Sequence, residues 1–284
     1  MKAVTRYSKS VWGLLLLSLF TPGAAMTQEL TPDILAGLNT GYKDTPMLPG
    51  ERWHVHDPDR PKPPVVTPGA DAGRPPSDAI ILFAGRDLSA FVGTDGKPAD
   101  WTVRDGVAAA PARASHLEFR DIRTRESFGD VQLHLEFREP DPPTGKGQMR
   151  GNSGVIFMGL YEIQILDSFE NPTYADGQAS AIYGWRPPLV NASRAPGEWQ
   201  TYDILFQRPR FGAAGKTLKP AFVTVFHNGV VTQANQMILG KTGWRTLPTY
   251  SAHADALPLV LQDHGSSVSF RNIWVRRLDT GDAN

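Results

Sequence analysis

From residue 78 onward the sequence consists of short runs rich in β-branched and aromatic residues, separated by Gly, Pro, Asn and Asp. No run has the sustained 3.6-residue period of a long amphipathic helix. Runs of this length and spacing predict an all-β fold, either a sandwich or a barrel. The expected strands are 79–83, 101–110, 116–120, 131–138, 153–158, 161–166, 199–207, 222–233, 257–262 and 268–278.

Two local signals predict how particular strands are connected or distorted. Asn228-Gly229 lies between two β runs and predicts a two-residue hairpin, because a type I′ turn needs a positive φ at both central positions. In the last run, the apolar alternation changes phase after Phe270, which predicts a β-bulge near Arg271-Asn272.

The N-terminal 25 residues have the three parts of a secretory signal peptide. Three basic residues precede the apolar run 11–20, and small residues lead to an expected cleavage near Ala25. The apolar run is too short to span a bilayer comfortably. We therefore expect a periplasmic or secreted protein with no membrane span.

Charge and cysteine content narrow the range of partners and of stabilising bonds. The chain has 29 Lys+Arg and 29 Asp+Glu, so removing the three basic residues of residues 1–25 leaves 26 against 29, a net charge of −3. This balance gives no indication of a nucleic-acid partner. Because cysteine is absent, neither disulfides nor thiolate metal sites can hold the fold, and a sizeable core must do so.

Residues 26–77 are expected to form an extended arm before the main domain at 78–278, and 279–284 a short tail. Nine prolines fall between positions 45 and 77, which excludes a helix or a central strand there. His54 and His56 in this arm form an H-x-H pair, which lacks the further ligands that a metal site needs. The sequence determines neither the oligomeric state nor the role of the arm.

Two of the expected strands carry a polar face opposite an apolar one, since strand side chains alternate with period two. In 161–166, Glu162 and Gln164 oppose two isoleucines. Asp167 would share their face if the strand bulged at its end; otherwise the strand ends at Leu166 and Asp167 begins a turn. In 131–138, the polar face consists of Gln132, His134, Glu136 and Arg138.

Nine motifs, in order, resemble the DUF1080 family, also called the 3-keto-disaccharide hydrolase domain. They are LFAGRDLSAF (82–91), WTVRDGV (101–107), EFR (136–138), GNSGV (151–155), YEIQILDS (161–168), AIYG (181–184), GEWQTYDI (197–204), HNGV (227–230) and LQDHGSSVSFRNIWVR (261–276). The resemblance implies a concanavalin A-like jelly-roll β-sandwich of two antiparallel sheets. It also implies a carbohydrate substrate, a glycoside whose sugar has been oxidised to a ketone at C3.

Related β-glucanases of this fold use a strand of the type E-x-D-x-x-E, and residues 162–167 read as E-x-Q-x-x-D. Gln164 cannot act as a carboxylate, which argues against a standard pair of catalytic carboxylates. A ketone at C3 offers another route, because it acidifies the hydrogen on C2. A base can then form an enediolate, the substituent on C1 leaves by β-elimination, and addition of water completes a net hydrolysis.

Such a site needs a base, a donor for the enediolate oxygen and an acid for the leaving group. The expected base is Glu162 or His134, and the expected acid is Asp167 or His264. For substrate binding we expect Gln164, Glu136, Arg138, Asn152, Tyr183 and Trp185, with Glu136 orienting His134 and the two aromatic residues stacking on sugar. These assignments assume that the polar faces of strands 131–138 and 161–166 line the same cleft.

We expect no metal or other cofactor, because no dense D-x-D-x-D pattern occurs. A structural calcium on loop acids such as Asp141, Asp167 or Asp176 is the alternative. Two other functions remain open: a non-catalytic, lectin-like carbohydrate-binding module, and a glycoside hydrolase acting on unoxidised sugars. The polar row of His, Glu and Arg favours an enzyme.

Overall fold

The computed structural model describes residues 41–112 and 119–279. The expected signal peptide at 1–25, the last residues of the tail and most of the expected strand 116–120 lie outside these residues. The chain divides into two compact units, Met1–Pro64 and Val65–Asn284. No helix in the described ranges is long and apolar enough to cross a membrane.

The described part of the first unit, residues 41–64, consists of turns, bends and one isolated β-bridge, between Met47 and His54. Backbone hydrogen bonds join Tyr42 N to His56 O and Leu48 N to Trp53 O, both at 2.9 Å. A ring nitrogen of His54 is hydrogen-bonded to the Thr45 carbonyl. One nitrogen of the H-x-H pair is therefore already engaged by the backbone.

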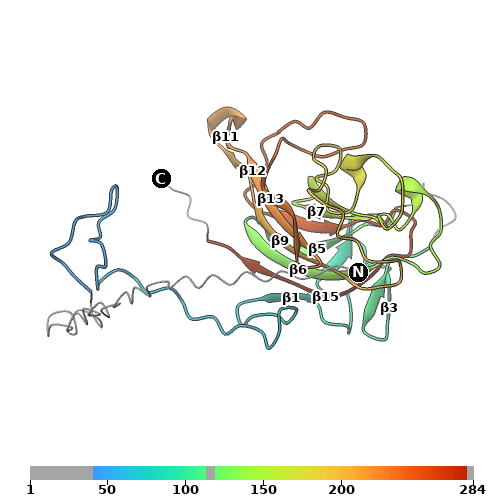
Figure 1. Ribbon diagram of the computed structural model, residues 1–284, viewed down its shortest axis with the longest axis horizontal. Coiled ribbons are helices and arrows are strands. Elements are labelled where there is room, and N and C mark those ends of the chain that lie inside the picture. Colours follow the sequence, from blue (N-terminus) through green and yellow to red (C-terminus); the bar gives the residue numbers. More distant parts are fainter. Residues whose placement is uncertain (1–40, 113–118, 280–284) are drawn as a thin grey trace, which may run out of the picture. The chain divides into compact units, whose positions relative to one another are not determined.

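The second unit contains two large antiparallel sheets, which confirms the all-β prediction (Figure 1). The eight-stranded sheet has the order β13-β12-β9-β6-β15-β4-β3, with β1 also paired to β15. Its strands are β1 (Ile80–Phe83), β3 (Thr102–Arg104), β4 (Val107–Ala109), β6 (Val131–Arg138), β9 (Gln200–Gln207), β12 (Ala221–His227), β13 (Val230–Ile238) and β15 (Ser269–Arg277).

The five-stranded sheet has the order β2-β5-β14-β7-β8. Its strands are β2 (Phe91–Gly93), β5 (Ile122–Phe128), β7 (Ser153–Phe157), β8 (Tyr161–Ile165) and β14 (Leu257–Leu261). Short elements outside the two sheets are the hairpin of β10 (Arg210–Phe211) and β11 (Thr217–Lys219) and the 3-10 turns η1 (Gly147–Met149), η2 (Ala175–Gly177) and η3 (Ala213–Gly215).

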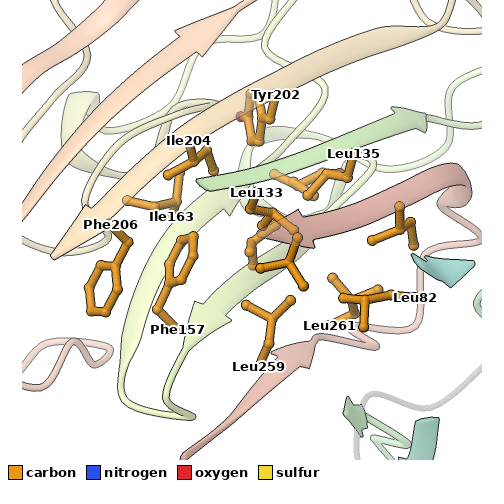
Figure 2. Close-up of a cluster of buried hydrophobic side chains, with 14 of the residues drawn as sticks. Leu82, Leu133, Leu135, Phe157, Ile163, Tyr202, Ile204, Phe206, Leu259 and Leu261 are labelled. Atoms are coloured by element: carbon orange, nitrogen blue, oxygen red, sulfur yellow. The ribbon is translucent and has the colours of Figure 1, made fainter. Parts of the chain in front are cut away.

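The hydrophobic core lies between the two sheets (Figure 2). The ring of Phe157 on β7 stacks on that of Phe206 on β9, with centroids 4.6 Å apart. Across the same interface, the hydroxyl of buried Tyr202 donates to the carbonyl of Gln164 at 2.7 Å. Burying each such large side chain stabilises the fold by roughly 1.5–3 kcal/mol. Each sheet therefore has one inner face in the core and one outer face.

The two local predictions of strand geometry are confirmed. The hairpin turn falls at Asn228 and Gly229, whose φ values are 53° and 78°. The pairing of β15 with β6 shifts register between Arg271 and Trp274, and Asn272 within the bulge has a φ of 48°. The sequence-based interpretation missed β5, because Arg, Thr, Glu and Ser interrupt its apolar pattern.

Candidate active site

Three neighbouring strands of the five-stranded sheet place polar side chains on its outer face. On β8, Ile163 and Ile165 belong to the core, so Glu162 and Gln164 point away from it. The register pairs Gly154 of β7 with Gln164. Gly154 also accepts a backbone hydrogen bond of 3.0 Å from Gln262, directly after β14. Glu162 and Gln164 on β8 and Gln262 directly after β14 thus lie on the same outer face, with Gly154 of β7 between them.

This outer face carries a cleft of about 530 Å³. Its volume falls in the range of small-molecule binding sites, roughly 300–1,000 Å³. The lining residues are Phe119, Gln148, Met149, Asn152, Glu162, Gln164, Tyr174, Tyr183, Gly243, Trp244, Gln262 and His264. The structure therefore brings together five of the residues expected from the sequence: Glu162, Gln164, Asn152, Tyr183 and His264.

Among the residues that the structure describes, the only acid lining this cleft is Glu162, which is 7% exposed. Burial, and then the nearby negative charge of Asp121, raises the pKa of its carboxyl to about 8. Within the described ranges, no basic side chain forms an ion pair with it. At neutral pH the carboxyl is mostly protonated, and once deprotonated it is a stronger base than an ordinary glutamate.

Side-chain amides line the cleft beside this carboxyl. Gln164 donates to Asn152 Oδ1 at 3.2 Å, and Asn152 donates to the Gln148 carbonyl at 2.7 Å, which fixes the orientation of both amides. Gln164 Oε1 and Gln262 Oε1 are buried and have no hydrogen-bond partner in the described part of the chain. Buried polar atoms are usually paired, so these two oxygens are available to accept hydrogen bonds from the hydroxyls of a ligand or from water.

Aromatic side chains form part of the wall. The imidazole of His264 stacks on the ring of Phe119, with centroids 5.1 Å apart. The hydroxyls of Tyr174 and Tyr183 are hydrogen-bonded at 3.1 Å. Burial raises the pKa of Tyr183, and the bond to Tyr174 raises it further, so its hydroxyl stays protonated. The wall therefore combines ring faces with hydroxyl groups.

The prediction that His134, Glu136 and Arg138 lie beside Glu162 is wrong. They project from β6 on the outer face of the eight-stranded sheet, because the alternate residues of β6 belong to the core. His134 Nδ1 is 2.7 Å from Asp203 Oδ1, and its ring stacks on Trp274. The core and both sheets thus separate this row from the cleft.

Polar side chains on β6 and β15, on the outer face of the eight-stranded sheet, hold the residues around Gly73, which precede β1. Glu136 Oε2 is 2.6 Å from Arg271 Nε, and Glu136 Oε1 accepts a 2.8 Å hydrogen bond from Asn272. Asn272 and Trp274 both donate to the Gly73 carbonyl, at 2.7 and 3.2 Å. Arg138 lies over the ring of Trp199 at 4.7 Å. Asn272 and Trp274 thus tie Gly73 to the sheet, and Glu136 holds Asn272 in place.

Asp167 does not reach the cleft either, since β8 ends at Ile165 with regular pairing and no bulge. Its buried carboxylate forms an ion pair with Arg150, with Oδ2 2.7 Å from Nε. Of the two alternatives from the sequence, the structure therefore shows the second, in which the strand ends before Asp167. Trp185 is half-buried against the core and donates to the Met237 carbonyl, so it does not line the cleft as expected.

Several lining residues escaped the sequence-based interpretation. Gln262 lies two residues before His264, so both side chains point to the same face if the extended backbone continues past the strand that ends at Leu261. Applying this alternation to residues 262–264 would have predicted that Gln262 lies in the cleft. Trp244, Tyr174 and Gln148 lie in connections without periodicity, where the sequence offers no such signal. No group of three His, Cys, Asp or Glu side chains able to hold a metal ion occurs in residues 41–112 and 119–279.

Comparisons with known proteins identify the family of the domain that carries this cleft. Residues 78–276 match the family model described as 3-keto-alpha-glucoside-1,2-lyase-like domain. A 3-keto-disaccharide hydrolase of Bacteroides thetaiotaomicron is 23% identical over 249 residues, covering 70% of this chain and 78% of that protein.

Two crystal structures from Parabacteroides distasonis, both carrying the provisional name of glycosyl hydrolase, are also similar. The first has 44% identity and a TM-score of 0.72, and the alignment covers 84% of this chain and 99% of that one. The second has 19% identity and a TM-score of 0.52, with 71% and 94% covered, and it supports the fold alone.

Proposed function

Because the chain belongs to the 3-keto-alpha-glucoside-1,2-lyase-like domain family, we propose that its cleft cleaves glycosides whose sugar ring carries a ketone at C3. The family and the related 3-keto-disaccharide hydrolase support a carbohydrate-active, hydrolase-like role. The observation that carries the proposal is Glu162, a buried carboxyl without an ionic partner among the described residues, placed beside amides and an imidazole. Export by residues 1–25 forms part of the same proposal.

The proposed reaction begins with loss of the C2 proton to the Glu162 carboxylate. The electrons of the C2–H bond move onto the C3 carbonyl oxygen and form an enediolate. As the enediolate collapses, the bond from C1 to the glycosidic oxygen breaks, and that oxygen takes a proton to leave as an alcohol. Water then adds across C1 and C2, with OH at C1 and H at C2, so the sum is a hydrolysis.

Each step has a suitable group in the cleft. Glu162 acts as the base, because a carboxylate of raised pKa has the higher proton affinity that a carbon acid requires. Amide groups of Gln164 and Gln262 contact the ketone and the ring hydroxyls, in place of the Arg138 expected from the sequence. His264 supplies the proton to the leaving group. The word lyase in the family description supports an elimination step.

The test is incubation of the purified protein with a 3-keto-glucoside and with its unoxidised parent, following release of the aglycone. Cleavage of the keto form alone is expected. Glu162→Gln should abolish it, whereas Glu126→Gln, at an exposed position on β5, is the matched control and should retain it. Cleavage of the unoxidised parent would favour an ordinary glycoside hydrolase, and sugar binding without cleavage would favour a lectin-like module.

A further inference from the structure

A second cleft of about 470 Å³ continues directly from the first. The two share the side chains of Tyr174, Tyr183 and Trp244 and the backbone of Gly243. The residues that line only the second cleft are Asp176, Gly184, Arg245, Thr246 and Leu247. A ligand longer than one sugar ring can therefore extend from the Glu162 cleft without leaving the surface.

The loop that forms this second cleft is fastened beside the catalytic candidate. Thr242 Oγ1 accepts a hydrogen bond from the backbone N–H of Glu162 at 3.0 Å and donates to the Leu160 carbonyl at 3.1 Å. At the loop ends, Lys241 N donates to Thr249 O at 2.9 Å. Because these bonds connect the loop to β8, the second cleft has a defined position relative to the Glu162 carboxyl.

The side chains of the second cleft suit a sugar. Trp244 is 67% exposed and Leu247 is 89% exposed, an unusual display of apolar surface next to a polar cleft. Asp176 and Arg245 add charged hydrogen-bonding groups around them. Sugars combine an apolar C–H face with hydroxyls at the rim, and this lining offers a partner for each.

Another cleft, also of about 470 Å³, adjoins the first at Phe119, but its chemistry is different. Its lining includes five charged side chains, four of which form two ion pairs. Lys97 Nζ is 3.0 Å from Asp95 Oδ2, and Arg120 forms an ion pair with Asp100. Binding a neutral sugar there would compete with these ion pairs, whereas in the cleft beyond Trp244 a sugar would meet the contact of the Arg245 guanidinium with the Trp244 ring, at 5.3 Å.

We propose that the cleft formed by Asp176 and the 243–247 loop binds the leaving sugar of a disaccharide substrate, while the 3-keto ring occupies the Glu162 cleft. This inference rests on the proposed function and assigns the direction of the substrate on the sheet. The leaving group then extends past Tyr174, Tyr183 and Trp244. Specificity for a sugar leaving group resides in residues that do not touch the reacting ring.

The test compares two substrates with the same oxidised ring: a 3-keto-glucose disaccharide and methyl 3-keto-glucoside. The double variant Asp176→Asn, Arg245→Asn removes both charges, and Asn suits the φ of 57° at position 245. We expect kcat/KM for the disaccharide to fall about tenfold, mainly through KM, while the methyl glycoside stays within about twofold of the wild type. Equal effects on both substrates, or none on the disaccharide, would overturn the proposal.

Binding of free glucose, measured by saturation-transfer difference NMR, tests the second cleft without depending on turnover. Wild-type protein should transfer saturation to glucose, and the double variant should transfer markedly less. If wild type cleaves neither keto substrate, the proposed function fails, and an unchanged glucose signal in the double variant separately refutes the subsite. Leu218→Ala, an exposed apolar position on β11, is the matched surface control.

Discussion

The Glu162 carboxylate lies against the backbone of Gly154, so closely that a Cβ atom at position 154 would be 2.5 Å from Glu162 Oε1. The two residues are on adjacent strands, where Glu162 pairs with Ile156 and Gly154 pairs with Gln164. Absence of a side chain at one position thus makes room for the carboxyl at the other.

Gly154→Ala should therefore displace the carboxylate without preventing folding. Position 154 has ordinary extended backbone, and the clashing atom is the end of a flexible side chain. Because displacements of about 1 Å in a catalytic group are costly, we expect kcat/KM for a 3-keto-glucoside to fall by about tenfold or more. Steady-state kinetics measures the loss of kcat/KM, and thermal unfolding of the same variant shows whether it is folded. A loss of activity explained entirely by unfolding would contradict the prediction.

The pH dependence of turnover should report Glu162. Burial raises the pKa of its carboxyl to about 8, and a base acts only when deprotonated. We therefore expect kcat/KM to rise about tenfold per pH unit below pH 8 and to level off above it. A profile that falls through pH 8 would show instead that the protonated carboxyl is the active form, as for an acid.

Stability should depend on pH through Glu139, which is 3% exposed. Burial raises its pKa from the ordinary 4.5 to about 8, and the negative charge of Asp167 adds to the shift. The folded state therefore binds this proton more tightly than the unfolded state. The resulting stabilisation is complete below pH 4.5 and is lost as the pH rises to 8.

Urea unfolding of Glu139→Gln at pH 5, 7 and 9 measures this effect. The variant should lose less of its free energy of unfolding over that interval than wild type, by on the order of a few kcal/mol. Glu162 contributes a dependence of the same sign in both proteins. Parallel curves for wild type and variant would contradict the assignment to Glu139.

Glu136→Gln distinguishes the sequence-based site from the observed one. Glu136 pairs with Arg271 on the outer face of the eight-stranded sheet, and Arg271 is substantially exposed. We expect a loss of stability of about 0.5–1 kcal/mol and a kcat/KM within about twofold of wild type. A loss of activity comparable to that of Glu162→Gln would place this row in the catalytic site after all.

Alternation along single strands was predictable because it is a local property of extended backbone. The sequence correctly indicated that Glu162 and Gln164 oppose Ile163 and Ile165, and that His134 opposes the apolar residues of β6. It also located the Asn228-Gly229 hairpin, because these residues favour a positive φ. The bulge at Asn272 was predictable because the apolar alternation of the last strand changes phase there.

Which outer face each polar row occupies was decided only by tertiary structure. A sandwich has two outer faces, and alternation states only that a residue points away from the core. Pairing of β6 with β9 and β15, and of β7 with β14, joins residues distant along the chain. With β8 paired to its neighbour β7, these long-range contacts put the rows of His134 and Glu162 on different sheets. The same long-range packing brings Trp244 beside Glu162, although no local pattern connects them.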